Sequence, residues 1–354
     1  MDPELSNDLV VKRLVDSGIQ VVVYCGEGVT TSLQDGVEMR KFHCEDLDIH
    51  DVGCIFECIS GDVKAKSEFY NRRSVVNSDV LLLSLGMPVR TCDSVRGMVP
   101  SRLFERLIPA CAPTFYHSGF ILECVLRNES VRGHFDALKE CYAGKLNFLV
   151  HSHGEISLFD RIGYFLATCS ILSAFDIGIG VEVADHIIAN EHTGIRMPGF
   201  FSAIDQMGVD RFVEGLVKLT GLLEEDDPLQ EMCRQLPPVI DGMISDGMTG
   251  ISGRGGFYRT YSMRYGTTDQ VIDLRSGLYR ALKRDMFLQE CLLDKRCGIF
   301  SDAVWSKFFA YVGFLVQKSG EEVLPEVDNI LQTGYRWQYG VKELAGRLGV
   351  SCTW

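Results

Sequence analysis

Four short and almost unbroken apolar runs mark the first 150 residues. These runs lie at residues 19–24, 54–59, 79–85 and 119–125. Continuous apolar runs are typical of strands buried on both faces of a largely parallel sheet. Amphipathic segments at 62–73 and 101–108 separate the runs and favour helices. The alternation predicts a doubly wound α/β domain.

The pattern changes after about residue 156 to longer segments with helical periodicity. These segments lie at residues 158–175, 209–223, 273–287 and 301–318. The glycine-rich stretch 252–259 indicates a loop that closes one helical unit. One apolar stretch, 162–181, is about as long as a membrane-spanning helix. Asp176 and several hydroxyl-bearing residues dilute it, so we expect a buried helix and no membrane partner.

The helical part contains an internal repeat, because residues 183–210 resemble residues 327–351. Each copy has a T-G-x-R motif, at Thr193 and at Thr333, and each runs through a predicted helix to a Gly-Val pair. The glycine after each threonine allows a turn between helices. A period near 140 residues is too long for a solenoid, so the pattern indicates a duplicated helical domain. We therefore predict three domains, at 1–155, 156–262 and 263–354.

The composition limits which binding partners and which cellular compartment are expected. A formal net charge of −13 argues against nucleic acid, which normally binds to a basic face. The acidic start of the sequence lacks a basic segment followed by an apolar one, so no secretory signal is expected. The chain has 13 cysteines. We interpret them as reduced thiols of a cytoplasmic protein.

Five motifs, in the same order along the chain, resemble those of one enzyme family. TGYRWQYGVKELAGRLGV is similar to that family's GxxWxxGPFExxDxxGV signature, and DRIGYF to its NRI segment. The other three are GRGGFYR, FECISGDVKAKSEFY and LFERLIPACAPTFYHSGFILECV. The whole chain resembles the 3-hydroxyacyl-CoA dehydrogenases, in the long form with two helical C-terminal domains. The resemblance implies a Rossmann-type domain, degenerate or truncated at its start, followed by two all-α domains.

The resemblance also implies which residues form the catalytic site. The family's catalytic histidine falls on Cys111, and the carboxylate that orients this histidine falls on Glu123. Beside Glu123 the pKa of a thiol should rise, so we expect Cys111 to be a buried replacement rather than a base. His117 is the local substitute, but direct contact with Glu123 would need a bend at residues 118–119.

Substrate and cofactor positions carry over in the same way. The family's active-site serine falls on Leu85, and the asparagine of its NRI segment falls on Asp160. The helix lysine is kept as Lys66, which also has an alternative interpretation as a solvated helix residue. No glycine-rich turn precedes the first predicted strand, but Glu27 lies close to the position of the acidic residue that holds the cofactor ribose. These positions make Glu27 and Lys66 the candidate NAD-binding residues.

One histidine pair lies outside the resemblance. His151 and His153 could together hold a metal ion, but no further ligand follows at a suitable spacing. A surface turn is the preferred interpretation of this pair.

Two functions follow from the sequence. The first is NAD-dependent oxidation of 3-hydroxyacyl-CoA in fatty-acid β-oxidation, as the resemblance implies, by a homodimer that binds an acyl-CoA-type small molecule. Replacement of the family's histidine and serine by Cys111 and Leu85 keeps an alternative open. In that alternative the chain is a non-catalytic acyl-CoA-binding or dimeric interaction module.

Overall fold

The computed structural model describes the chain from residue 21 to residue 352, with gaps. The described residues are 21–25, 37–41, 54–57, 63–71, 75, 80–85, 100–116, 121–126, 128–144, 146–151, 157–263, 266–283 and 294–352. Internal contacts divide the chain into two compact units. The α/β unit comprises residues 1–113 and 119–157, and the helical unit comprises 114–118 and 158–354. Each unit is described by itself.

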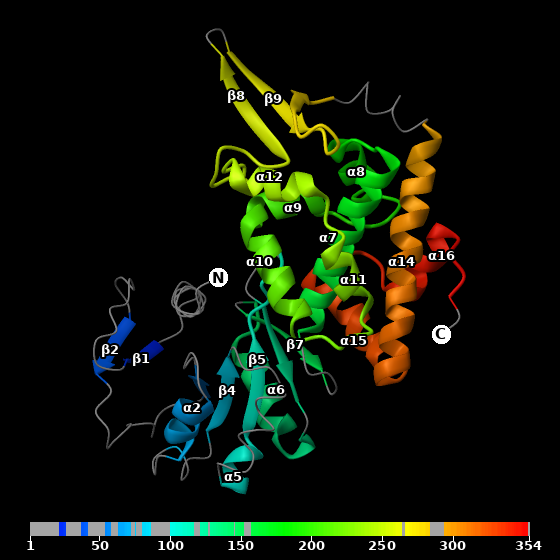
Figure 1. Cartoon of the computed structure of the whole chain (residues 1–354). Coiled ribbons are helices and arrows are strands. Elements are labelled where there is room, and N and C mark those ends of the chain that lie inside the picture. The colour runs from blue at the N-terminus through cyan, green and yellow to red at the C-terminus, as the bar shows by residue number, and fades with distance from the viewer. Residues whose placement is uncertain are drawn as a thin grey trace. The chain divides into compact units, whose positions relative to one another are not determined.

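A five-stranded sheet with the order β3-β4-β5-β6-β7 forms the centre of the α/β unit (Figure 1). Its strands are Cys54–Glu57, Leu81–Leu85, Leu107–Cys111, Ile121–Val125 and Asn147–His151. Strands β3, β4 and β5 run parallel, β6 is antiparallel to β5, and β7 is parallel to β6. A separate parallel pair joins β1 (Val21–Cys25) to β2 (Val37–Lys41).

The two faces of the five-stranded sheet differ in chemistry. One face packs under α6 (Arg132–Cys141), whose Phe135 and Leu138 join a continuous apolar core. The strand residues of this core are Leu81, Leu83, Leu85, Ile108, Ala110, Leu122, Cys124 and Phe148. Neighbouring residues of a strand point to opposite faces, so the residues between these belong to the other face. Side chains from α2 (Val63–Tyr70) pack there. Two short helices, α5 (Ser101–Phe104) and η1 (Glu129–Val131), complete the described part of this unit.

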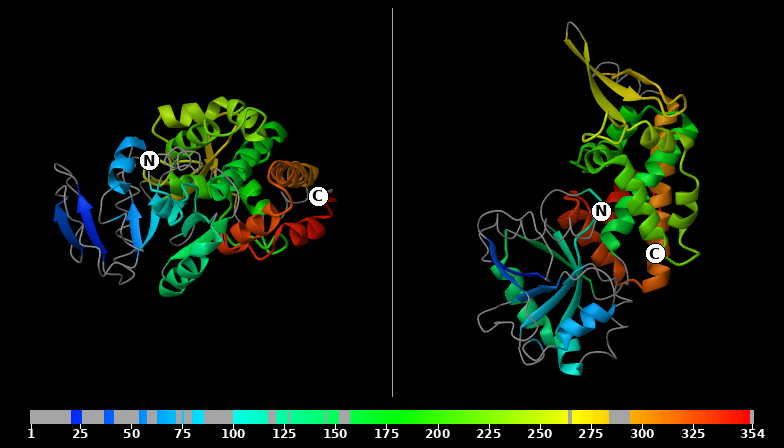
Figure 2. Two further views of the ribbon diagram at one scale, coloured as in Figure 1. Left: turned by 90° about the horizontal axis from the view of Figure 1, so that it is seen from below. Right: turned by 60° about the vertical axis from the view of Figure 1, so that its left-hand side comes forward.

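Two long helices organise the helical unit. Helix α7 (Leu158–Ile177) packs against α14 (Lys295–Ser319), and Phe165 stacks on Tyr311 with 3.9 Å between ring centroids. Figures 1 and 2 show the shorter helices of this unit around the pair. These helices are α8 (Val181–Ile188), α9 (Phe200–Met207), α10 (Val209–Thr220), α11 (Pro228–Arg234), α12 (Pro238–Ser245), α15 (Val323–Asn329), the π-helix η2 (Ile330–Gly334) and α16 (Val341–Leu348).

By length and apolar composition alone, both α7 and α14 could cross a membrane. In the structure, 89% of the most apolar 18-residue stretch of α7 is buried inside the protein. Its first residues, Leu158 and Phe159, and the centre of the helix at Leu166 are all buried. The environment of α7 is therefore that of a core helix, which is what the sequence predicts for residues 162–181.

Both copies of the internal repeat use the same capping arrangement. In the first copy, Asp185 on α8 accepts hydrogen bonds from the backbone N–H groups of Phe201 and Ser202 at the start of α9. In the second, Asp328 on α15 accepts from Val341 N at the start of α16, at 2.6 Å. A glycine precedes each capped helix because a Cβ there would lie within 2.6 Å of the aspartate. This shared geometry supports the predicted duplication, whereas the division into two helical domains stays a prediction.

A three-stranded antiparallel sheet interrupts the helices. Strands β8 (Tyr258–Met263) and β9 (Gly266–Ile272) form a hairpin, and β10 (Tyr279–Ala281) pairs with β9. The prediction of a helix over 273–287 is therefore wrong at the described residues 273–283. The prediction of all-helical structure after residue 156 is wrong at the three strands. The predicted helix 101–108 ends early, because β5 already begins at Leu107. The β-branched residues of TTDQVI, at 267–272, were the overlooked strand signal.

Two buried carboxylates hold the start of β8. Asp205 on α9 accepts from the backbone N–H groups of Phe257 and Tyr258, both at 2.7 Å. Asp185 accepts from the Tyr258 hydroxyl at 2.9 Å. Burial raises the pKa of Asp185 to about 6 and that of Asp205 to about 7, from a usual value of 3.8. The two carboxyl groups therefore retain protons in the folded chain at a pH where the unfolded chain has lost them.

This difference in proton binding predicts that the helical unit loses stability as the pH rises. The stabilisation by the two protonated carboxyl groups is complete below about pH 4 and is lost as the pH rises through about 6 and 7. We expect the free energy of unfolding to fall by roughly 4 kcal/mol between about pH 5 and pH 8. Urea titrations followed by tryptophan fluorescence would measure this fall, because Trp305 and Trp337 are buried in the helical unit.

Asp205→Asn should flatten this pH dependence, since the variant removes the group with the higher pKa. Asp246→Asn is the matched control, because Asp246 is exposed on the same unit. If the free energy of unfolding falls with pH as much in Asp205→Asn as in the wild type, these carboxylates are not the cause of the fall.

Candidate active site

The face of the sheet opposite α6 carries a polar residue on every strand. We call this the polar face, and its members are Glu57, Ser84, Cys111, Glu123 and His151. Ser84, Cys111 and Glu123 each stand next to a residue of the apolar core, and Glu57 and His151 stand next to Phe56 and Val150, which pack against that core. Strand alternation therefore places all five on one side. The register brings Glu57 opposite Ser84 and Cys111 opposite Glu123.

Glu123 lies at the centre of one cluster on the polar face. Its Oε1 lies 2.9 Å from Nε2 of His151, and both side chains are 2% exposed. Its Oε2 accepts a hydrogen bond from the Ser157 hydroxyl and lies 3.9 Å from the Cys111 thiol. Thus one carboxylate oxygen faces a histidine while a hydroxyl and a thiol contact the other.

His151 is the candidate site residue whose position the sequence interpretation missed. It ends β7, where Leu149 two residues before it is fully buried, so a turn at the surface is wrong for His151. Ser152 and His153 lie outside the described residues. The apolar run FLV directly before His151 was the signal that it closes a strand rather than opens a loop.

A histidine beside a carboxylate is an arrangement suited to proton transfer. Imidazole titrates near neutral pH, and a neighbouring carboxylate fixes its tautomer and stabilises the imidazolium that forms when the ring accepts a proton. The contacts from Ser157 and Cys111 to Oε2 restrict how the carboxylate of Glu123 can rotate, and this keeps Oε1 directed at the ring. Cys111 is half-buried and is one of the groups that hold the carboxylate. His117 lies outside the described residues, so its pairing with Glu123 stays a prediction.

A second cluster on the polar face surrounds Lys66. Its ammonium lies 3.0 and 2.9 Å from the two carboxylate oxygens of Glu57 and 3.4 Å from the backbone oxygen of Leu85. Tyr70 donates to Glu57 at 2.5 Å, and Ser84 donates to the same carboxylate at 2.7 Å. All four side chains of the cluster, those of Glu57, Lys66, Tyr70 and Ser84, are buried.

This second cluster bears on the predicted cofactor. The parallel strands β3, β4 and β5 present their carboxyl ends at one edge, where α/β sheets bind nucleotide cofactors. Lys66, however, is 3% exposed and committed to Glu57, so in this arrangement it does not fit direct contact with a dinucleotide. Glu27 lies outside the described residues.

The two predicted substrate residues occupy different environments. Leu85 ends β4 with its side chain in the apolar core on the α6 side. Asp160, on α7, accepts hydrogen bonds from the backbone N–H groups of Thr114 and Phe115 and from the Thr114 hydroxyl, at 2.8 to 3.0 Å. The Asp160 carboxylate thus anchors the segment 114–115 within the helical unit.

Comparison with known proteins gives distant sequence relatives. The chain is 26% identical over 190 residues to a putative fatty acid oxidation complex trifunctional enzyme of Rickettsia felis. It is 25% identical over 190 residues to the protein of the same description from Rickettsia prowazekii. Each match covers 52% of this chain and 26% of the relative, so it spans about a quarter of the length of these relatives. No protein-family model matches the chain.

Solved structures show the same fold. The 3-hydroxybutyryl-CoA dehydrogenase of Escherichia coli K12 aligns over 96% of this chain and 89% of its own, with a TM-score of 0.58 and 11% identity. The dehydrogenase part of multifunctional enzyme 1 from C. elegans aligns over 88% and 69%, with a TM-score of 0.52 and 14% identity. A Rossmann-like sheet followed by a helical region is therefore confirmed.

Proposed function

We propose, from the resemblance of this chain in sequence and fold to the 3-hydroxyacyl-CoA dehydrogenases, that it oxidises 3-hydroxyacyl-CoA with His151 as the base. The observation that carries the proposal is the 2.9 Å contact between His151 Nε2 and Glu123 Oε1. The family's carboxylate is kept at Glu123, and a histidine on the neighbouring strand supplies the imidazole that Cys111 cannot.

In this proposal the chain's own residues handle the proton. With Nε2 beside the carboxylate of Glu123, the other ring nitrogen, Nδ1, accepts the proton of the substrate's secondary hydroxyl. The negative charge of Glu123 stabilises the imidazolium that results, and the contacts from Ser157 and Cys111 hold Glu123 in place. NAD, when bound, supplies the acceptor for the hydride.

The test is an NAD-linked oxidation assay of the full chain across 3-hydroxyacyl-CoA substrates of increasing chain length. We expect formation of NADH that saturates with acyl-CoA. Absence of turnover with every substrate, by a chain that remains folded by circular dichroism, would overturn the proposal.

Cys111→Ala should retain turnover within about threefold of the wild type, whereas removal of a general base costs 10²- to 10⁴-fold. The thiol contacts Oε2 of Glu123, which the Ser157 hydroxyl also contacts. Steady-state kinetics with the preferred acyl-CoA would measure the effect. A loss of 10²-fold or more would identify Cys111, rather than His151, as the base.

A second candidate function rests on Leu85 and Asp160. The Leu85 side chain is apolar and buried in the core, and the Asp160 carboxylate binds backbone N–H groups. In this arrangement neither residue offers a polar contact to the substrate. This favours a non-catalytic module that binds acyl-CoA or associates as a homodimer. Calorimetric binding of an acyl-CoA without turnover, together with light scattering at the mass of a dimer, would support it.

A further inference from the structure

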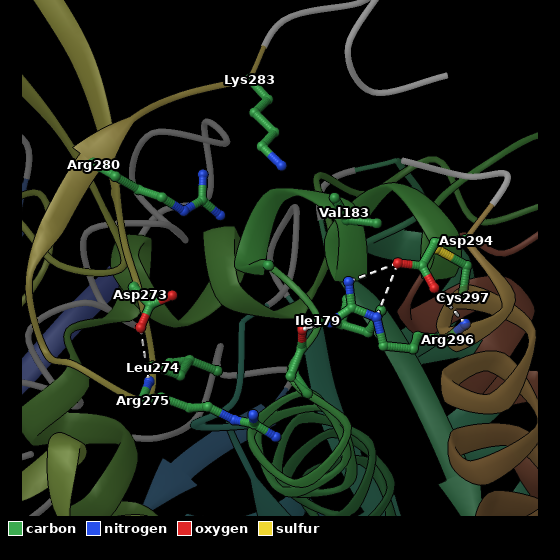
Figure 3. A pocket seen from close by; sticks show the side chains of 13 residues that line it. Ile179, Val183, Asp273, Leu274, Arg275, Arg280, Lys283, Asp294, Arg296 and Cys297 are labelled. Atoms are coloured by element: carbon green, nitrogen blue, oxygen red, sulfur yellow. Dashed lines mark hydrogen bonds and ion pairs between the residues drawn. The ribbon is translucent and has the colours of Figure 1, made fainter. Parts of the chain in front are cut away.

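The three-stranded sheet of the helical unit has an open edge at β8. Its strand order is β10-β9-β8, so within the described ranges β9 is paired on both sides and β8 on one side. At the opposite edge, β10 is three residues long, and its Arg280 pairs with both carboxylate oxygens of Glu182 on α8 at 2.6 and 2.8 Å. Figure 3 shows Arg280 extending from β10 beside the cavity at the turn between α7 and α8. Short edge strands offer little to a further strand, so β8 is the edge that can extend the sheet.

The hydrogen bonds at the start of β8 show which of its backbone groups point away from β9. The N–H of Ile272 donates to the carbonyl of Phe257 at 2.9 Å, so the carbonyl of residue 257 faces β9. In an antiparallel pair the next residue, Tyr258, then directs its polar groups outward. Its N–H donates to Asp205 at 2.7 Å, and its carbonyl accepts from Gly256 N at 3.0 Å. The even-numbered residues of β8 therefore carry the outward backbone groups.

Thr260 and Ser262 are the next two even-numbered residues of β8. Asp269 stands opposite Thr260, and its carbonyl accepts from Leu282 N at 2.9 Å on the β10 side, which directs this carbonyl away from β8. Across the described chain, no hydrogen bond from outside the sheet reaches the backbone of Thr260 or Ser262. The β8 edge thus presents two N–H groups and two carbonyl groups with the spacing of a sheet ladder.

The side chains of β8 fit an interface better than a protected edge. Tyr261 stands between the two open residues and is 50% exposed. The guanidinium of Arg259 lies 5.3 Å from the centre of the Tyr261 ring and 3.5 Å from that of Tyr279, and its Nε donates to Gln270 at 2.8 Å. The strand has neither the lysine nor the proline with which natural edge strands block pairing, and its own sheet holds its one charge. Tyrosine and arginine are also residue types that dominate binding at interfaces.

We propose that the β8 edge pairs in antiparallel fashion with the β8 edge of a second copy of the chain, around a twofold axis at Tyr261. In this register Thr260 of each copy stands opposite Ser262 of the other, so the open backbone groups of both strands find partners. Arg259 stands opposite Met263 rather than opposite a second arginine, and the two Tyr261 residues face each other across the axis. Figures 1 and 2 show β8 and β9 extending beyond α8, α9 and α12, so these helices do not cover the far part of β8.

The occupant of the edge is a second copy because the register is self-complementary. The same two residues supply the donors and the acceptors on both sides, which is the condition for an interface with twofold symmetry. The proposal rests on the homodimer of the second candidate function and names the surface that forms it. It holds whether or not the chain is catalytic.

The experiment is sedimentation velocity of the full chain over a range of concentrations. We expect a monomer–dimer equilibrium with a Kd of roughly 10 μM, because a single short strand gives a small interface. Thr260→Pro removes the N–H that donates across the axis and should raise this Kd by about tenfold or more. Proline is tolerated at an edge position whose N–H points outward, and circular dichroism would show that the variant is folded.

Thr260→Val is the matched control. Like the proline variant it loses the hydrogen bond from the Thr260 hydroxyl to Asp269, but it keeps the backbone N–H. Its Kd should stay within about twofold of that of the wild type, since valine is also favoured in strands. If Thr260→Pro and Thr260→Val dimerise equally well, the proposal fails.

A charge exchange at Tyr261 tests the register. Tyr261→Glu and Tyr261→Lys should each be monomeric, because each places like charges opposite one another at the axis, whereas an equal mixture of the two should associate. The proposal is overturned if the mixture stays monomeric, or if the wild type stays monomeric up to about 200 μM. A dimer that persists in Thr260→Pro would also overturn it, and would leave the homodimer of the second candidate function intact on another surface.

Discussion

His151→Gln is expected to lower kcat for oxidation of 3-hydroxyacyl-CoA by 10²- to 10⁴-fold, the range for loss of a general base. Glutamine keeps a polar side chain beside Glu123 but cannot accept and hold a proton at neutral pH. KM should change little, because the variant removes a group that acts on the reacting hydroxyl and leaves the rest of the substrate's contacts. Steady-state kinetics over a range of acyl-CoA concentrations would measure both constants.

His134→Gln is the control for this experiment, because His134 is an exposed histidine on α6 of the same unit. Its kcat should match that of the wild type. Equal activity of the two variants would exclude His151 as the base. The pH profile gives a further check, since the fall in kcat at low pH should disappear in His151→Gln.

Lys66→Met should destabilise the α/β unit by roughly 3 to 5 kcal/mol, because removing one partner of a buried ion pair leaves the other charge buried without its counter-ion. Glu57 and Lys66 are both 3% exposed, and in the variant Glu57 would keep the hydrogen bonds from Tyr70 and Ser84 but lose the Lys66 ammonium. All three tryptophans fall in the helical unit, so fluorescence would miss the effect. Hydrogen exchange of β3 and β4, measured by mass spectrometry, would detect it.

Lys139→Met is the matched control, because Lys139 is exposed on α6. Its exchange in β3 and β4 should equal that of the wild type. The double variant Lys66→Met with Glu57→Gln should recover part of the loss, since it removes the uncompensated charge as well. If the double variant recovers none of the lost stability, Lys66 stabilises the unit through its aliphatic stem.

The sequence was sufficient to predict some of the elements that the structure shows, whereas β2, β5, β7 and α6 were missed. Apolar runs placed β3, β4 and β6 within a few residues, and helical periodicity placed α7, α10 and α14. The predictions failed where neighbouring signals overlap. Leu274 and Leu278 are spaced like the apolar face of a helix, yet Leu278 is 70% exposed in a turn that leads to β10. Pairing with β9 decides the structure there, and pairing partners cannot be identified from a single segment.

The candidate site was likewise predicted only in part. Resemblance to a family pointed to Glu123 and Cys111, which the register indeed brings opposite each other. It could not point to His151, because that residue reaches Glu123 from a strand whose pairing only the structure reveals. Likewise, Lys66 has the sequence environment of a surface helix lysine, and only the packing of α2 on the polar face shows it to be buried.

The segment Thr114–Ser118 has a practical consequence for dissecting the chain. It belongs to the helical unit although residues of the α/β unit flank it on both sides. Phe115 is buried there against Tyr164 and Tyr335, and Asp160 binds the backbone of the segment. A truncation that starts at Leu158 would delete the Phe115 side chain from the interior. It would also remove the backbone N–H groups that the buried Asp160 carboxylate binds. The helical unit is thus a product of two separate stretches of the gene, and a fragment meant to represent it must restore residues 114–118, for example by circular permutation or as an added peptide.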